Sequence, residues 1–148
     1  MQTEVQNPIE ILLVEDNEAD VVLTQRAFCK GKITNNVQVA YDGKQALEML
    51  RQEGEYVNNP RPHVILLDIN LPKMSGHDVL KEIKTDDNLK RIPVIMLTSS
   101  EADIDIYKSY EYNASSYIVK PVNADKFKKV VEAIEDFWFS VVALPDLK

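Results

Sequence analysis

Five short apolar segments recur along the chain, and consecutive segments are separated by enough residues for a helix. They span 9–14, 36–40, 64–67, 92–97 and 115–119. Each is shorter than a typical helix and rich in Val, Ile or Leu, so the pattern predicts strands, most of them buried on both faces of a parallel sheet. The third segment lies within RPHVILLDINLP and runs into a single carboxylate, Asp68.

The stretches between these segments have the apolar spacing of helices. Asn17 is a good N-cap for a first helix in which Ala19, Leu23 and Ala27 lie four residues apart, and Gly31 would end it. The later helices are predicted from Ala46, Leu47 and Leu50; from Val79, Leu80 and Ile83, ending near Asp87; from Ile104 and Tyr107; and from the stripe between Phe127 and Val141. The stripe of the fourth helix is thin, so we expect this helix to be weakly held. Residues 52–62 carry Gly, Asn and Pro and predict a loop.

Strand and helix alternate five times, which predicts one α/β domain. Such alternation requires parallel strands joined by right-handed crossovers, with helices on both faces of a doubly wound five-stranded sheet. A length of 148 residues suits a single domain with its own core, and the sequence contains no internal repeat or linker.

Composition and charge narrow the possible partners. The chain has 17 basic and 24 acidic residues, a net charge of −7, which argues against nucleic-acid binding because phosphate contacts need basic clusters. No apolar run approaches the roughly 20 residues of a membrane span, and the N-terminus lacks a signal-peptide pattern. We therefore expect a soluble, cytoplasmic protein without membrane contact. His63 and His77 are isolated in the sequence, which disfavours zinc.

Polar residues that carry chemistry follow four of the predicted strands: Glu15 with Asp16, then Asp68, Thr98 and Lys120. The carboxyl ends of parallel strands gather at one edge of the sheet, where ligands bind. Three carboxylates placed together repel one another unless a cation binds, and an all-oxygen set suits Mg²⁺. The backbone carbonyl of Asn70 could add a ligand, while a lysine ammonium and a threonine hydroxyl would serve a transferred phosphoryl group.

Each of these residues also has an ordinary structural explanation. Glu15 and Asp16 could favour the start of the first helix, Asp68 could be a turn residue, Thr98 an N-cap, and Lys120 a surface lysine. Their joint placement, with a polar group at one strand end after another, is what favours a phosphoryl-transfer site.

Four motifs, ILLVEDN, VILLDINLPKMSG, VIMLTSS and YIVKPV, together resemble the receiver domain of two-component response regulators, over about residues 9–139. The resemblance implies the flavodoxin-like fold of CheY, with strand order 2-1-3-4-5, and phosphotransfer from a sensor histidine kinase to Asp68. It implies Glu15, Asp16, Asp68 and the Asn70 carbonyl as the site of Mg²⁺ or Mn²⁺, with Glu15 acting through water. It further implies Thr98 and Tyr117 as a switch pair, Lys120 as the partner of the phosphoryl oxygen, and a cis Lys120–Pro121 bond.

One residue departs from the pattern of many receivers, which carry two aspartates where this chain has Glu15 and Asp16. Glutamate is longer by a methylene, so Glu15 would either reach the metal directly or shift its water. The departure therefore puts the affinity for metal in question more than the existence of the site.

The resemblance also sets expectations for domain limits and partners. We expect an N-terminal tail at 1–8, the receiver at 9–139, and the end of the last helix with a C-terminal tail at 140–148, without an output domain. A closer resemblance is to stand-alone regulators that partner bacterial phytochromes, which implies such a kinase, an unidentified downstream protein and a homodimer through the fourth-helix to fifth-helix face. The apolar residues expected on that face are Tyr107, Tyr110, Phe137, Trp138, Phe139, Val141 and Val142.

Two other functions compete with a phosphorylation switch that catalyses only its own phosphorylation and dephosphorylation and is not otherwise an enzyme. A haloacid-dehalogenase-like phosphatase also uses an aspartyl nucleophile, but it needs a second acid two residues later, where this chain has Asn70. A pseudo-receiver would bind partners without phosphorylation, and the intact set of Asp16, Asp68, Thr98 and Lys120 argues against it.

Overall fold

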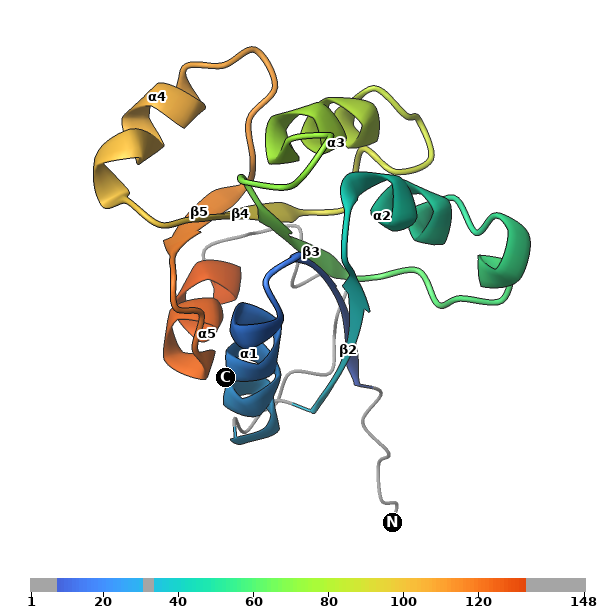
Figure 1. Cartoon of the computed structure of the whole chain (residues 1–148), viewed down its shortest axis with the longest axis horizontal. Coiled ribbons are helices and arrows are strands. Elements are labelled where there is room, and N and C mark those ends of the chain that lie inside the picture. The colour runs from blue at the N-terminus through green and yellow to red at the C-terminus, as the bar shows by residue number, and fades with distance from the viewer. Residues whose placement is uncertain (1–7, 31–33, 133–148) are drawn as a thin grey trace.

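The computed structural model describes residues 8–30 and 34–132. Five strands form one parallel sheet in the order β2-β1-β3-β4-β5 (Figure 1). Their bounds are Ile9–Val14 for β1, Asn35–Ala40 for β2, Val64–Asp68 for β3, Val94–Thr98 for β4 and Ser116–Val119 for β5. The predicted doubly wound sheet and its strand order are therefore confirmed.

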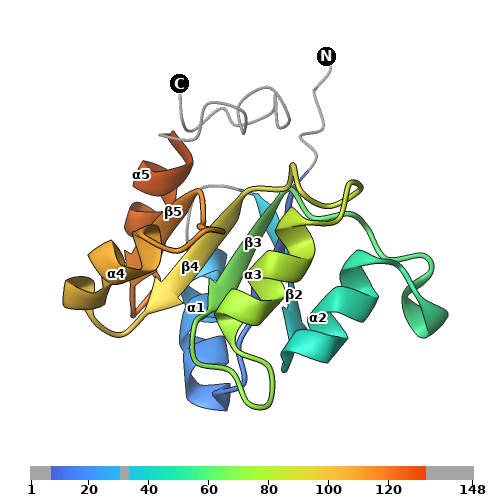
Figure 2. The same cartoon turned by 90° about the horizontal axis from the view of Figure 1, so that it is seen from above.

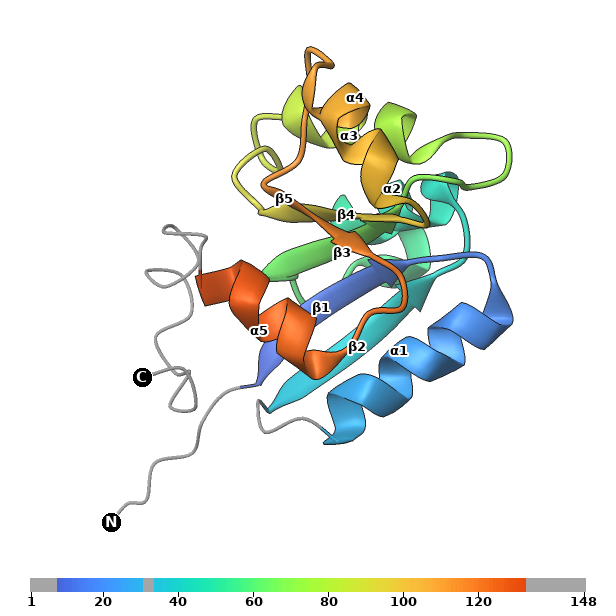
Figure 3. The same cartoon turned by 90° about the vertical axis from the view of Figure 1, so that its left-hand side faces the viewer.

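Helices cover both faces of the sheet (Figures 1 and 3). They are α1 (Glu18–Lys30), α2 (Gly43–Leu50), α3 (Gly76–Lys84), α4 (Ile104–Lys108) and α5 (Ala124–Glu132), with single 3₁₀ turns η1 (Gly54–Tyr56) and η2 (Glu101–Asp103). α1 and α5 lie on one side, here called the α1/α5 face, and α2, α3 and α4 lie on the other, the α2–α4 face. None of the helices in the described ranges has the length and hydropathy needed to cross a bilayer.

Alternation along the central strands divides the core between these two faces. In β3, Val64 and Leu66 belong to the cluster under α1 and α5, whereas Ile65 and Leu67 belong to the cluster under α2 and α3. All five residues of β3 are buried, because the strand lies between β1 and β4 and is covered on both sides. Strand β3 is thus a rigid support for the residue at its end, and Figure 2 shows it at the centre of the sheet.

The first helix is where predicted, but a different side of it faces the core. Leu23 is 51% exposed, and the buried residues are Val21, Thr24 and Phe28. Phe28 packs edge-on against Phe127 of α5, with ring centroids 4.8 Å apart. Apolar residues occur on several sides of this helix, so spacing alone did not identify the buried stripe. The N-cap was predicted correctly, since the Asn17 side chain accepts a hydrogen bond from the Asp20 backbone N–H at 3.0 Å.

Some element limits differ from the prediction. β4 begins at Val94 rather than at residue 92, because the Ile92 N–H bonds back to Leu89 in a turn and Pro93 has no N–H to give. α3 ends at Lys84 rather than near residue 87. The predicted loop 52–62 contains η1, and the predicted end of the first helix at Gly31 lies outside the described residues.

The fourth helix, predicted to be weakly held, is short. It has five residues, and none of them is buried. Tyr107 packs against the core of the α2–α4 face, while Ile106 and Tyr110 are exposed. The remaining residues of the predicted apolar surplus, from Phe137 to Val142, lie outside the described residues.

Candidate functional site

Asp68 lies at the carboxyl end of the buried central strand and is 3% exposed. Both of its carboxylate oxygens accept hydrogen bonds: Oδ1 from the Asn70 backbone N–H at 3.0 Å and Oδ2 from the Lys120 ammonium at 2.9 Å. The loop behind it is closely packed, since a Cβ atom at Gly76 would collide with the Asp68 carbonyl oxygen. The carboxylate is therefore held in one orientation by its surroundings.

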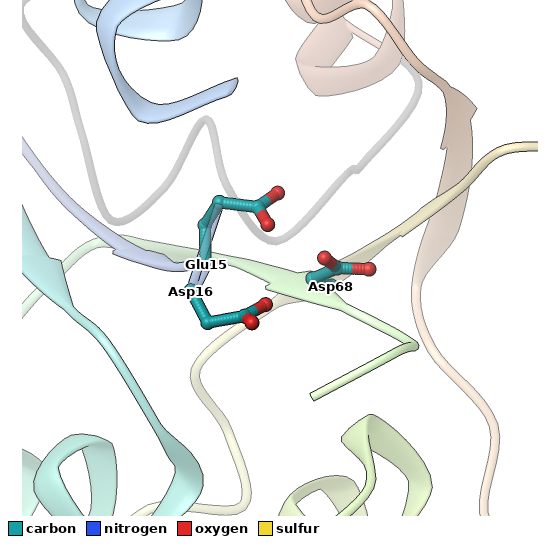
Figure 4. A group of neighbouring side chains, drawn as sticks. All are labelled: Glu15, Asp16 and Asp68. Atoms are coloured by element: carbon teal, nitrogen blue, oxygen red, sulfur yellow. The ribbon is translucent and has the colours of Figure 1, made fainter. Parts of the chain in front are cut away.

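Two more carboxylates follow β1, the strand next to β3. One carboxylate oxygen from each of Glu15, Asp16 and Asp68 can be chosen so that the three oxygens lie within 4.8 Å of one another. Figure 4 shows the Glu15 and Asp16 side chains extending toward Asp68 from the end of β1. Glu15 is buried at 1% exposure and also accepts a hydrogen bond from the Asn17 N–H at 3.2 Å, whereas Asp16 is exposed. The cluster thus has an inner side closed by protein and an outer side open to solvent.

Lys120 brings a positive charge to the same place. Its Nζ atom lies 2.7 Å from Glu15 Oε1, 2.9 Å from Asp68 Oδ2 and 3.1 Å from Asp20 Oδ2. The following Lys120–Pro121 bond is cis, as the resemblance implied. The sequence analysis did not predict Asp20 as a site residue, because a carboxylate in the first turn of a helix is ordinarily explained by the helix dipole. Its position in the helix that directly follows Glu15 and Asp16 was the feature that could have indicated it.

These contacts raise the pKa values of both Glu15 and Lys120. Burial, with the neighbouring Asp68 carboxyl, raises the pKa of Glu15 to about 7, although the Lys120 ammonium opposes the change. Burial alone would lower the pKa of Lys120, but its hydrogen bonds to Glu15 and Asp68 outweigh this and raise that pKa above its usual range. Lys120 therefore keeps its charge at every pH where the fold is of interest.

Thr98 and Tyr117, the expected switch pair, do not contact Asp68 in the described hydrogen bonds. The Thr98 hydroxyl bonds to the backbone of Ser100, accepting from its N–H at 3.2 Å and donating to its carbonyl at 3.3 Å. The Tyr117 hydroxyl accepts from the Ala114 N–H at 3.4 Å, and its ring stacks on Tyr107 of α4 with centroids 6.4 Å apart. Tyr117 thus connects the edge strand β5 to α4.

Strand alternation explains which predicted residues meet. Glu15, Asp68 and Lys120 each come two residues after a member of the α1/α5 core, namely Leu13, Leu66 and Ile118. Thr98 comes two residues after Met96 of the opposite core, so it belongs to the α2–α4 face. The Asn70 N–H reaches Asp68, while a metal contact from the Asn70 carbonyl stays a prediction.

The donor set fits a hard divalent cation. Three carboxylates from two adjacent strands offer only oxygen atoms, and they repel one another when the site holds no cation. Mg²⁺ and Mn²⁺ prefer such ligands and keep part of their coordination shell as water, which the exposed side at Asp16 allows. The geometry therefore combines a fixed carboxylate, a cation site and a lysine ammonium.

Comparison with known proteins agrees with this geometry. The family model of the response regulator receiver domain matches residues 11–132. Response regulator Rcp1 of Synechocystis sp. is 45% identical over 145 residues, which cover 98% of this chain and 99% of Rcp1. The solved Mn²⁺-bound form of Rcp1 has a TM-score of 0.70 at 46% identity and covers 93% of this chain and 99% of its own.

Two further solved structures are also similar. The bacteriophytochrome response regulator AtBRR has a TM-score of 0.82 at 44% identity, covering 89% of this chain and 96% of its own. The phosphorylated cyanobacterial phytochrome response regulator RcpA has a TM-score of 0.72 at 46% identity, covering 94% and 99%. With the receiver-domain model matched over most of its length and a relative 45% identical across nearly all of it, this chain belongs to the response regulator receiver domain family.

Proposed function

We propose that this response regulator is a phosphorylation-controlled switch in which Asp68 accepts a phosphoryl group from the phosphohistidine of a sensor histidine kinase. The observation that carries the proposal is the buried Asp68 carboxylate, fixed at 2.9 Å from the Lys120 ammonium and within 4.8 Å of Glu15 and Asp16. An Asp68 oxygen attacks phosphorus, the phosphorus–nitrogen bond breaks, and its electron pair stays on the histidine nitrogen. Lys120 then pairs with a phosphoryl oxygen.

Glu15, Asp16, Asp68 and the Asn70 carbonyl would hold Mg²⁺ or Mn²⁺, which supplies neutralisation of charge on the phosphoryl oxygens when bound. The carboxylate set supports this assignment. Catalysis by the chain is limited to its own phosphorylation and dephosphorylation. The alternative of a haloacid-dehalogenase-like phosphatase is not supported by the family match. Such a phosphatase needs an acid two residues after its nucleophile, where this chain has Asn70.

Thr98 and Tyr117 would carry the signal to the α2–α4 face. To reach a phosphoryl group, the Thr98 hydroxyl must leave its two contacts with Ser100. Tyr117, stacked on Tyr107, would move with it, and α4 has no buried residue to hold it in place. Hydrogen exchange with and without beryllofluoride, a phosphoryl mimic, tests this; unchanged protection across residues 98–117 would contradict it.

The phosphoacceptor role has a direct test. The protein is incubated with acetyl phosphate and Mg²⁺, and its intact mass is measured. We expect one phosphoryl group on the wild-type protein and on Asp87→Asn, a control at an almost fully exposed carboxylate, and none on Asp68→Asn. Addition that survives Asp68→Asn would overturn the assignment, and absence of addition to the wild type would favour a pseudo-receiver.

The proposed kinase is a bacterial phytochrome, because RcpA and AtBRR are response regulators of phytochromes and resemble this chain over most of its length. A phosphotransfer profile against phytochrome and other histidine kinases would identify the partner by its rate. Output would then pass to a protein partner or through a homodimer on the α4 and α5 side, where Tyr110 and Ile106 are exposed. Light scattering with and without beryllofluoride measures that dimer.

A further inference from the structure

Lys120 contacts one carboxylate that does not belong to the metal cluster. Its ammonium lies 3.1 Å from Asp20 Oδ2, in addition to its contacts with Glu15 and Asp68. Asp20 stands in the first turn of α1, and its backbone N–H is fixed by the Asn17 cap at 3.0 Å. The Lys120 side chain is 20% exposed and that of Asp20 is 36% exposed, so Asp20 lies on the outer side of the ammonium.

The ammonium and a divalent cation share two carboxylates. Glu15 and Asp68 supply two of the three ligands in the cluster, and both already hold Lys120 at hydrogen-bond distance. Two cations that share the same carboxylates repel each other, more strongly on the side of the site that the protein closes. The ammonium therefore opposes binding of a divalent cation, and this repulsion falls if the ammonium shifts away from Glu15 and Asp68.

We propose that Asp20 is a positioning residue that retains the Lys120 ammonium on the α1 side of the site when a divalent cation binds Glu15, Asp16 and Asp68. This inference rests on the proposed function, because it assumes the metal site described above. Asp20 lies outside that site but contacts the ammonium directly, so the ammonium can shift toward it without losing all its partners. Without Asp20, the described residues give the Lys120 ammonium no carboxylate within 4.0 Å other than Glu15 and Asp68, which the incoming cation also uses.

Asp20 has a second explanation that the test must separate from this one. A carboxylate in the first helical turn stabilises a helix through its dipole, and that effect does not depend on Lys120. Glu18 lies in the same turn, is exposed, and is not among the three carboxylates on Lys120. Glu18→Gln is therefore the matched control for loss of one negative charge at this helix end.

The test is titration calorimetry of the full chain with Mg²⁺ alone. We expect Asp20→Asn to weaken Mg²⁺ binding about three- to tenfold, a coupling at the lower end of the range for groups in contact. Glu18→Gln should change it less than about twofold, as a screened surface charge does. Asp20→Glu, which keeps the carboxylate, should restore most of the affinity.

A double-mutant cycle with Lys120→Met decides whether Asp20 acts through Lys120. In the Lys120→Met background, Asp20→Asn should weaken Mg²⁺ binding no more than Glu18→Gln does. An undiminished effect there would mean that Asp20 acts on the metal by charge alone, and it would overturn the proposal while leaving the metal site intact. If Lys120→Met fails to fold, Lys120→Gln takes its place in the cycle. Failure of the wild-type protein to bind Mg²⁺ would overturn the metal site itself, and the proposal with it.

Discussion

The two faces of the sheet hold their parts of the site in different ways. On the α1/α5 face, Glu15 and Asp68 are buried and share one ammonium at 2.7 and 2.9 Å. On the α2–α4 face, the hydrogen bonds described for the Thr98 hydroxyl are longer and go to the Ser100 backbone, and α4 has no buried residue. The first arrangement fixes the charges on which the proposed phosphotransfer depends, and the second leaves groups that can move at small cost. Because side chains alternate between the two faces of the sheet, the fixed charges and the movable groups lie on opposite faces.

The largest expected effect comes from removing the charge on the α1/α5 face. Lys120→Met would leave two buried carboxylates without their cation and should lower the free energy of unfolding by about 2–4 kcal/mol. Urea unfolding at pH 8 in the presence of EDTA measures this, and Mg²⁺ should recover much of the loss.

The control for that experiment is Lys90→Met, which breaks an exposed ion pair with Asp87. Such a pair is worth little, so the change should stay within about 0.5 kcal/mol. Equal losses of unfolding free energy in Lys120→Met and Lys90→Met would mean that the charges of the site depend on one another no more than surface charges do. The proposed difference between the two faces would then be wrong.

An intermediate effect concerns pH. Because the pKa of Glu15 is raised to about 7, a proton competes with Mg²⁺ at this carboxylate below that pH, and the affinity should fall by up to about tenfold per pH unit. Calorimetric titrations between pH 6 and 8 measure the slope, and Glu15→Gln should flatten it. A slope unchanged in Glu15→Gln would assign the proton to another group.

In the metal-free protein, Glu15 should make the free energy of unfolding fall as the pH rises, whereas its effect on Mg²⁺ affinity is a rise with pH. Glu15 takes up its proton near pH 7 in the folded chain but only near its usual 4.5 when unfolded. Its contribution to stability is therefore complete below about pH 4.5 and is lost as the pH rises through 7.

The smallest expected effect uses the two histidines as a matched pair. Both ring nitrogens of His77 are buried without a hydrogen-bond partner among the described residues, and the ring lies 5.0 Å from Tyr107 and 4.5 Å from Tyr110. His77→Phe removes unsatisfied polar atoms next to α4 and should stabilise the protein by about 0.5–1 kcal/mol. In His77→Phe, amide hydrogen exchange at Ser109 and Tyr110 should slow by an amount that matches the gain in stability measured by urea unfolding.

His63 should respond in the opposite direction. Its Nδ1 accepts a hydrogen bond from the Glu10 backbone N–H at 2.8 Å, so His63→Phe leaves that donor without a partner and should destabilise the protein by about 1 kcal/mol. Urea unfolding of the two variants side by side gives both signs. Destabilisation by both would show that the His77 ring holds α4 by more than its apolar contacts.

Periodicity carried the prediction of the fold a long way. Runs such as VILLD are too apolar and too short for anything but buried strands, and five of them separated by helical patterns allow few topologies. Asp68, the proposed acceptor, its neighbours Glu15 and Asp16, and Lys120 could be identified because they stand at or just after the ends of strands. The buried side of α1 could not, since Leu23 fits a helical stripe as well as Val21 does, and only packing of the helix against the sheet and α5 distinguishes them.

The sequence by itself determined which residues stand at the carboxyl ends of the strands, because that depends only on local pattern and chain order. Only the tertiary structure decided how they are shared out: Glu15, Asp68 and Lys120 meet on the α1/α5 face, while Thr98 belongs to the other. It also brought Asp20 onto Lys120 across 100 positions of sequence. Such a contact depends on where α1 packs against the sheet, and no spacing along the chain encodes it.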